Sequence, residues 1–186
     1  MSKKIVITGG IGYIGTELCK IYSGISWNNE ILVIDNRFIS ERVNQLRNWG
    51  IDFIHGDILD KDLVSKHCKD ADVVHHLAGI TDVPRVKNES NNEKDSKIKL
   101  VAEEGTQNIL DSINDKCKII FPSSHVVYEG IEKVKNDIME EEDTKPILSY
   151  ASSKANNEKQ IKNSGKNYFA FIIYSIKYIL SSFFCY

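Results

Sequence analysis

The sequence contains few cysteines and no surplus of basic residues, and each shortage excludes a class of protein. Its four cysteines, Cys19, Cys68, Cys117 and Cys185, are far apart in a chain of 186 residues and match no metal-binding spacing. They are too sparse for a disulfide framework, so we expect free thiols in a reducing cytoplasm. The 24 Lys and Arg residues are balanced by 26 Asp and Glu residues, which gives no indication of nucleic-acid binding.

Signals for export and for membrane anchoring are also missing. Residues 1–4 lead straight into a strand-like run without an apolar signal region, so export is not expected. The most apolar stretch, 168–186, is interrupted by Lys177 and is a poor candidate for a membrane span. We interpret its first half as a core strand and residues 177–186 as an apolar tail, whose exposure would favour self-association. A truncated product, with a tail that lacks its partner, stays open as an alternative.

What the sequence does contain is a regular alternation of apolar runs and helical patterns. Strand-like runs lie at 5–7, 30–35, 51–55, 72–79, 118–121 and 167–176. Helical patterns lie between them, at 14–21, 40–49, 61–68, 98–113 and 146–163, while the polar residues 81–97 and the acidic residues 137–143 are typical of loops. This order predicts an α/β fold, a doubly wound parallel sheet of the Rossmann type with helices on both faces, in one domain over 1–176.

A glycine-rich turn follows the first strand. Gly9, Gly12 and Gly15 are three residues apart, which is the spacing that allows a sharp turn, close approach of a pyrophosphate, and tight packing of the next helix. The N–H groups at the start of that helix would face the anion. On this motif alone, a tight turn that binds no ligand remains an alternative.

An acidic residue ends the second strand at the distance expected for a dinucleotide site. Asp35 lies 20 residues after Gly15, where a carboxylate accepts hydrogen bonds from the adenosine ribose and repels a 2′-phosphate. This favours NAD over NADP, although Arg37 is close enough in sequence to accommodate that phosphate. Capping of the following helix by Asp35 is the structural alternative.

A candidate proton-transfer group lies near the end of the chain. Tyr150 and Lys154 are four residues apart and therefore share a helix face. A neighbouring ammonium favours the phenolate form of tyrosine, and Ser124, after the fifth strand, can hold a substrate hydroxyl or carbonyl beside it. Taken alone, a Tyr and a Lys on an exposed helix face are more often without a role; their order behind the glycine turn and Asp35 changes that interpretation.

In combination, these motifs resemble the extended short-chain dehydrogenase/reductase family, in its NAD-dependent epimerase/dehydratase branch of nucleotide-sugar enzymes. The matching stretches are TGGIGYIG at 8–15, DN at 35–36, GDI at 56–58, HLAG at 76–79, SS at 123–124 with VY at 127–128, and YASSK at 150–154. They cover the chain to about residue 170.

The resemblance implies a role for each matching position. NAD would be the cofactor and a nucleotide-sugar the substrate, with a homodimer through helices 98–113 and 147–163. The catalytic residues would be Tyr150 as base, Lys154 as its activator, and Ser124. The cofactor-binding residues would be Gly9, Gly12, Tyr13, Ile14 and Gly15 at the pyrophosphate, Asp35 and Asn36 at the ribose, Asp57 and Ile58 at the adenine, Leu77, Ala78 and Gly79 towards the nicotinamide, and Tyr150 and Lys154 at the nicotinamide ribose.

Three departures from the family pattern bear on the reaction. His125 and Val126 replace the acid pair of the sugar 4,6-dehydratases, which favours an epimerase or a 4-keto reductase; His125 as an acid/base group is less favoured than a strand-end role. Ala102 replaces an Asn that faces the cofactor. After the last strand, Ile173, Ile176 and Ile179 replace an Arg, an Asn and a Gly, and we expect the substrate lobe of the family to be absent.

Two other functions stay open. A cofactor-binding module without turnover would fit the missing lobe, and an NADP-dependent carbonyl reductase would share the fold, although Asp35 argues against it. The paired histidines His75 and His76 have no further ligands at metal spacing, so we expect no metal site and two strand-end or core side chains.

Overall fold

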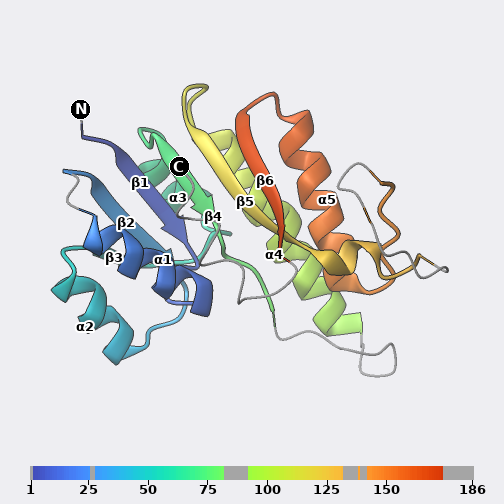
Figure 1. Ribbon diagram of the computed structural model, residues 1–186, viewed down its shortest axis with the longest axis horizontal. Coiled ribbons are helices and arrows are strands. Elements are labelled where there is room, and N and C mark those ends of the chain that lie inside the picture. The colour runs from blue at the N-terminus through green and yellow to red at the C-terminus, as the bar shows by residue number, and fades with distance from the viewer. Residues whose placement is uncertain (1, 26–27, 82–91, 132–137, 139–141, 174–186) are drawn as a thin grey trace.

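The computed structural model describes residues 2–25, 28–81, 92–131, 138 and 142–173, and they form a six-stranded sheet in the order β3-β2-β1-β4-β5-β6 (Figure 1). Each neighbouring pair is parallel. The strands are β1 Lys4–Thr8, β2 Glu30–Asp35, β3 Asp52–His55, β4 Val73–His76, β5 Lys118–Ser124 and β6 Asn167–Ile173. The order reverses between β1 and β4, so the predicted doubly wound parallel sheet is confirmed.

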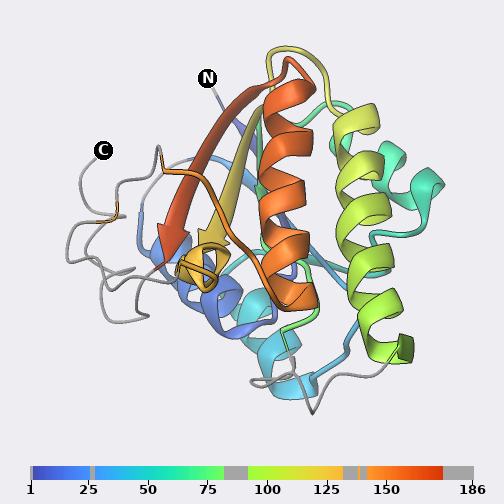
Figure 2. The same ribbon diagram turned by 90° about the vertical axis from the view of Figure 1, so that its right-hand side faces the viewer.

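Helices cover both faces of this sheet, also as predicted. They are α1 Tyr13–Gly24, α2 Ser40–Asn48, α3 Lys61–Cys68, α4 Asn92–Ser112 and α5 Ser149–Asn163, with a short 3-10 helix, η2 His125–Tyr128, after β5. In Figures 1 and 2, α1 and α2 lie on one side of the sheet, while α3, α4 and α5 lie on the other. Both helix layers pack on the sheet, so its inner strands are buried on both faces. This burial explains the continuous apolar runs of those strands.

The alternation of side chains along β1 separates two cores. Ile5 and Ile7 pack with Leu18 of α1 and Leu46 of α2. Val6 faces the opposite layer, whose buried residues come mainly from the strands and from α3, α4 and α5 and include Val64, Ile109, Leu110, Phe121 and Ile161. Because successive strand residues point to opposite faces, one short strand anchors both layers.

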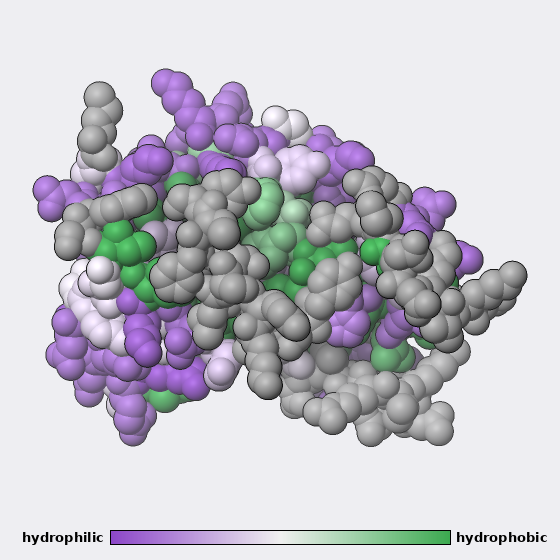
Figure 3. Space-filling view, viewed as in Figure 1, coloured by the Kyte–Doolittle hydropathy of each residue, from purple (hydrophilic) through white to green (hydrophobic). Residues whose placement is uncertain are grey.

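The surface that faces the viewer of Figure 1 has an apolar centre. Figure 3 shows hydrophobic residues gathered in the middle of this view and hydrophilic residues around its outline. Phe169 of β6 is 42% exposed. Its ring stacks on Phe171, with the centroids 5.8 Å apart, and lies 5.6 Å from Lys118 Nζ. β6 therefore keeps aromatic side chains partly in contact with solvent.

Several element boundaries differ from the sequence prediction; α5, for example, begins at Ser149 and not at 146. α4 begins at Asn92, whereas residues 92–97 were expected in a loop, because its first turns are largely polar and carry no apolar period; Glu93 and Asp95 suit a helix start. β4 ends at His76, so residues 77–79 follow the strand. β5 continues through Pro122 to Ser124. Its paired register with β4 ends at Ile120, so Pro122 pairs only towards β6, where a strand tolerates proline.

Some predictions lie outside the described residues. These concern most of the 81–97 and 137–143 loops, the domain boundary at 176, Ile176 and Ile179, and the tail 177–186. Of the cysteines, Cys19, Cys68 and Cys117 are buried free thiols, as expected, while Cys185 falls in the undescribed part. Within the described ranges, no helix is both long enough and apolar enough to cross a membrane.

Candidate functional site

The glycine turn between β1 and α1 is built so closely that side chains would not fit. Gly9 has a φ of 72°, in the left-handed region, and its N–H donates to the Ile34 carbonyl over 2.8 Å. A Cβ at Gly9 would lie 2.7 Å from the Ala78 nitrogen, and one at Gly15 would lie 2.5 Å from Gly10 Cα. All these neighbours are backbone atoms. Through Gly9 the turn packs directly on the residues that follow β4, and through Gly15 the start of α1 packs on the turn itself.

The helix that follows this turn begins without a side-chain cap. Gly12 occupies the N-cap position, makes no side-chain hydrogen bond, and is followed by no acidic residue in the first turn of α1. Tyr13, the first helical residue, is 62% exposed. Since the first N–H groups of a helix have no partner inside the helix, this end can accept an anion.

Asp35 ends β2 beside the turn, and its carboxylate is already hydrogen-bonded on both oxygens. Oδ2 accepts from the Ile11 N–H over 3.2 Å and Oδ1 accepts from the Arg37 N–H over 3.0 Å. The Arg37 guanidinium also contacts both oxygens, at 3.3 and 3.4 Å. The N-cap of α2 is Ile39, so Asp35 does not cap that helix. The carboxylate instead ties the second strand to the glycine turn.

The two residues predicted to contact the adenine, Asp57 and Ile58, lie near Asp35, and they differ in their surroundings. Asn36 Nδ2 donates to Asp57 Oδ2 over 2.9 Å, and the Leu59 N–H donates to Asp57 Oδ1 over 3.0 Å. Ile58 is buried at 4% exposure and packs in the core with α4. Its side chain therefore supports the site from behind, while Asn36 lies at the surface.

The chain after β4 runs alongside the turn, where the sequence predicts a path for a ligand. The Leu77 N–H donates to the Thr8 carbonyl over 3.1 Å, and the Ala78 N–H donates to the Thr8 hydroxyl over 3.3 Å. A Cβ at Gly79 would have open space around it. The glycine turn and residues 77–79 thus form one connected wall at the carboxyl edge of the sheet.

The predicted catalytic helix is attached to the end of the neighbouring strand. Lys154 Nζ donates to the Pro122 carbonyl of β5 over 2.9 Å and lies 4.5 Å from the centroid of the Phe121 ring. Burial lowers the pKa of Lys154 to about 8, and Glu158 opposes that shift. Ser124 ends the same strand. The α5 helix and Ser124 are therefore both placed by β5.

The electrostatics of Tyr150 differ from the sequence expectation. Its ring centroid lies 6.0 Å from Lys154 Nζ, whose hydrogen bond goes to Pro122 instead. Burial raises the pKa of the Tyr150 phenol. The expected lowering by the ammonium is not found, because desolvation of the phenolate dominates at this distance.

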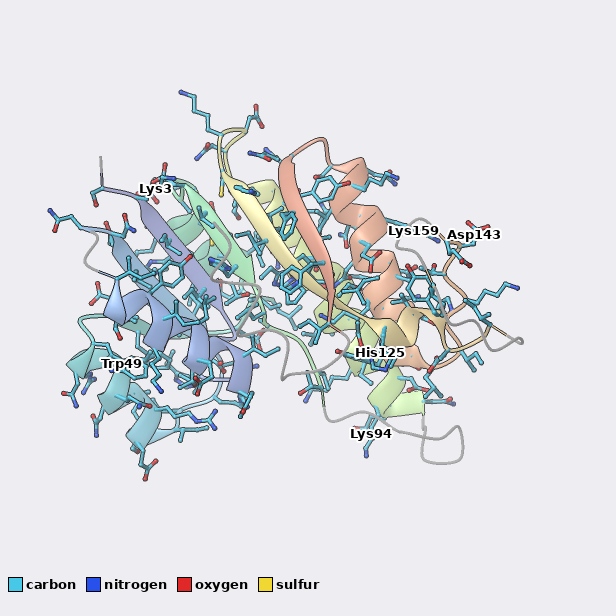
Figure 4. All side chains as sticks on the ribbon, viewed as in Figure 1. Lys3, Trp49, Lys94, His125, Asp143 and Lys159 are labelled. Carbon is cyan, nitrogen blue, oxygen red and sulfur yellow. The ribbon has the colours of Figure 1, made fainter. Side chains whose placement is uncertain are left out.

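The position of His125 favours a strand-end role over a role as an acid/base group. It begins η2 directly after β5, and Nδ1 lies 3.2 Å from the Ile173 carbonyl at the end of β6. Figure 4 shows His125 near the ends of β5 and β6. The ring links the two strand ends, as expected of a polar strand-end residue.

Sequence reasoning missed several polar residues that support the site. Glu158 accepts a hydrogen bond from Ser123 Oγ at the end of β5, and Arg42 donates to the Ile11 carbonyl of the glycine turn. The four-residue spacing from Lys154 to Glu158 was the one available signal, because such a pair shares a helix face. Arg42 carries no spacing signal, since its partner is 31 residues away.

The arrangement as a whole fits a dinucleotide. The uncapped end of α1 offers N–H donors to a pyrophosphate, the glycines let it approach, and Asp35 offers an acceptor for ribose hydroxyls. Tyr150, Lys154 and Ser124 belong to the β5 side of the point where the strand order reverses. In open α/β sheets, ligands bind in the crevice at this point. Within the described residues, no group of three or more metal-binding side chains occurs.

Several known proteins are similar to this chain in sequence and in fold. The profile of the 3-beta hydroxysteroid dehydrogenase/isomerase family matches residues 6–171. The CDP-paratose 2-epimerase of Salmonella typhi is 31% identical over 143 residues, which cover 71% of this chain and 40% of that protein.

Two solved structures extend the comparison. UDP-glucose 4-epimerase from Brucella ovis, in complex with NAD, has a TM-score of 0.75 at 27% identity and covers 94% of this chain. UDP-N-acetylglucosamine 4-epimerase from Methanobrevibacter ruminantium, in complex with UDP-N-acetylmuramic acid, has a TM-score of 0.73 at 28% identity and covers 91% of this chain. This chain covers 52% and 54% of those chains, so it spans about half the length of these relatives.

The profile match extends from β1 into β6, and the fold agrees with that of the epimerases over more than nine-tenths of the chain. The chain belongs to the 3-beta hydroxysteroid dehydrogenase/isomerase family, among the extended short-chain dehydrogenases/reductases and in their NAD-dependent epimerase/dehydratase branch.

Proposed function

We propose that this chain forms the NAD site of a nucleotide-sugar epimerase or 4-keto reductase, with Tyr150 as its base. The observation that carries the proposal is the attachment of α5 to the end of β5 through Lys154 and Pro122. This contact supports the proposal because it attaches the Tyr150–Lys154 helix to β5, on the other side of the strand-order reversal from the glycine turn and Asp35. The names of the relatives support the substrate class, since the proteins that match include epimerases of CDP- and UDP-sugars.

The cofactor would be held by the residues that border the turn. Gly9, Gly12, Tyr13, Ile14 and Gly15 would receive the pyrophosphate, while Asp35 and Asn36 would bind the adenosine ribose. Asp57 and Ile58 would border the adenine, and Leu77, Ala78 and Gly79 would border the nicotinamide. For Asp35 to accept a ribose hydroxyl, the Arg37 guanidinium must move, because it now contacts both carboxylate oxygens.

Tyr150, Lys154 and Ser124 would then handle the proton of the substrate. NAD, when bound, would supply the hydride acceptor for a sugar carbon, and the hydroxyl on that carbon would lose its proton. Tyr150 takes that proton as phenolate, and Ser124 holds the oxygen by a hydrogen bond. Because burial raises the pKa of Tyr150, the base form depends on the positive charge of Lys154. The same Lys154 would hold the nicotinamide ribose.

A second candidate is a cofactor-binding module without turnover. Such a module would need only the cofactor site, and this chain covers about half of the solved relatives. The family resemblance puts nucleotide-sugar binding mostly in a lobe beyond the Rossmann-type domain. Within this chain α4 packs on α5. The family resemblance implies a homodimer through these two helices, and sedimentation would measure it.

The deciding experiment measures NAD binding first and turnover second. Calorimetric titration of the purified chain should show NAD binding, weakened about tenfold or more in Asp35→Ala, because two ribose hydrogen bonds are lost. Incubation with NAD and a panel of nucleotide-sugars should give NADH absorbance or an altered sugar. Tyr150→Phe should remove turnover but leave binding, and Tyr168→Phe on β6 is the matched control.

Each outcome selects one function. Wild-type protein that does not bind NAD would contradict both candidates. NAD binding without turnover of any sugar supports the binding module. Tighter binding of NADP than of NAD would instead favour the carbonyl reductase, and Asp35→Ala tests whether the carboxylate sets that preference.

A further inference from the structure

A chain of buried hydrogen bonds connects the glycine-turn side of the site with the helix that carries Tyr150 and Lys154. It runs through Thr8 at the end of β1, His76 at the end of β4, Thr106 of α4 and Asn157 of α5. Each of these four residues is at most 5% exposed. Polar groups this deeply buried destabilise the fold unless every one is bonded, so the pairing of each atom matters.

At the α5 end of this series of hydrogen bonds, the side-chain amide of Asn157 fixes which groups donate and which accept. The amide orientation that satisfies its neighbours lets Nδ2 donate to the Ser153 and Ala102 carbonyls, at 3.2 and 3.3 Å. Its oxygen then accepts from the Thr106 hydroxyl over 3.1 Å. The single proton of Thr106 is thereby used, so Thr106 Oγ1 must accept from His76 Nε2, which lies 2.9 Å away.

At the glycine-turn end of this hydrogen-bonded series, the donor and acceptor roles can be assigned in the same way. The Ala78 N–H donates to Thr8 Oγ1 over 3.3 Å, which leaves the Thr8 proton for His76 Nδ1 at 3.1 Å. The bonds at both ends therefore assign one state of the ring, the neutral form with its proton on Nε2. Protonation of Nδ1 would break the bond from Thr8. Burial, assisted by the nearby charge of Lys154, lowers the pKa of His76 to about 3 and so keeps the ring neutral.

The two ends of this chain touch the two halves of the proposed site. Ala78 lies against Gly9, where an added Cβ would be 2.7 Å from its nitrogen. Ser153, whose carbonyl Asn157 holds, precedes Lys154 on α5. Phe121, which packs on Lys154 Nζ, also lies beside the His76 ring, with centroids 5.7 Å apart. The buried hydrogen bonds of His76 therefore offer a direct connection through which a shift at one end can reach the other.

We infer that His76 is a positioning residue that couples the Gly9–Ala78 wall to α5 through Thr8, Thr106 and Asn157. The inference rests on the proposed function, since the wall and the helix would hold opposite ends of the nicotinamide half of NAD. His76 itself touches neither cofactor nor substrate in this role. It sets the distance between the groups that do.

A double-mutant cycle tests this coupling. The affinity for NAD is measured by calorimetry for wild type, Thr8→Val, Thr106→Val and the double variant; valine keeps the shape of threonine and removes the hydroxyl. We expect non-additive losses, with a coupling of about fivefold in Kd, because both hydroxyls act through one ring. In a His76→Leu background the two losses should become additive.

A structural role alone would leave a different signature. Thr8 and Thr106 would then couple in the free energy of unfolding but give additive effects on the affinity for NAD, and that result would overturn the inference. His75→Leu is the matched control, because His75 is equally buried on the opposite face of β4, bonded to Tyr22 of α1 over 2.7 Å. It should leave the coupling intact.

Two further measurements keep the outcomes separate. Nitrogen-15 NMR of the protein without cofactor should show His76 neutral, with its proton on Nε2; a charged ring or the other tautomer would overturn the inference. If His76 has this state and the unfolding energies couple, yet wild type does not bind NAD, the proposed function fails while the hydrogen-bonded chain stands. His76→Gln, which keeps a donor near Nε2, should lose less affinity than His76→Leu.

Discussion

His75 and His76 are adjacent in sequence, yet they serve opposite layers of the molecule. His75 faces α1, where Nε2 lies 2.7 Å from the Tyr22 hydroxyl, and its Nδ1 has no hydrogen-bond partner among the residues that the structure describes. His76 faces α4 and is bonded on both nitrogens. Burial lowers the pKa of His75 to about 4 and that of His76 to about 3. The native state thus carries two neutral imidazoles that the unfolded chain would protonate near pH 6.5.

These shifts predict loss of stability in mild acid. Between pH 6.5 and about 4 the unfolded chain binds more protons than the native state, so the free energy of unfolding falls as the pH falls, by up to about 1.4 kcal/mol per pH unit for each histidine. Urea denaturation at a series of pH values measures the slope. His75→Gln should reduce it. A pH-independent unfolding energy across this window would contradict the prediction.

At the scale of elements, α5 combines a buried cation with its counter-charge. Lys154 and Glu158 are one turn apart, and both reach the end of β5, at Pro122 and Ser123. Glu158 keeps the pKa of Lys154 from falling further. The helix therefore carries its own means of keeping the ammonium charged beside Tyr150.

Replacing Glu158 should weaken this arrangement. Glu158→Gln removes the negative charge, so the pKa of Lys154 should fall below its value of about 8, as NMR titration of labelled lysine would show. The bond from Ser123 also becomes weaker, which should cost about 1–2 kcal/mol of unfolding free energy. Glu104→Gln, at an exposed position of α4, is the control. An unchanged Lys154 pKa in Glu158→Gln would exclude Glu158 as the counter-charge.

Local sequence patterns predicted nearly all of the helices and strands. Most of the features that they missed depend on contacts between residues that are distant in sequence. The strands follow from continuous apolar runs and most helices from an apolar period of 3.6 residues, and the glycine turn with Asp35 follows from spacing over a short stretch. The start of α4 was missed because its first turns are polar. Thr106 and Asn157 gave no signal because they are ordinary residues whose importance arises from contact with His76 and with each other. The pKa direction at Tyr150 also depended on burial, which the spacing to Lys154 does not contain.

At the scale of the whole molecule, NAD should stabilise the fold by mass action. At 100 times the dissociation constant, binding adds about 2.7 kcal/mol to the unfolding free energy and raises the melting temperature by about 5–10 °C. Gly15→Ala should lose this shift, because its Cβ would lie 2.5 Å from the Gly10 backbone. Gly24→Ala, with open space around its Cβ, should keep it. Equal shifts in both variants would contradict the role of the turn.

The strand order has a consequence for how the chain folds. β1, β2 and β3 are neighbours in succession, and so are β4, β5 and β6, so each of these pairings closes one crossover connection. The pairing of β1 with β4 joins strands whose partners, such as Thr8 and His76, are 68 residues apart in sequence. Among the described strands, the largest loop-closure entropy falls on this junction. We therefore expect pairing within each half to precede the β1–β4 interface, which carries Thr8, His76 and the glycine turn.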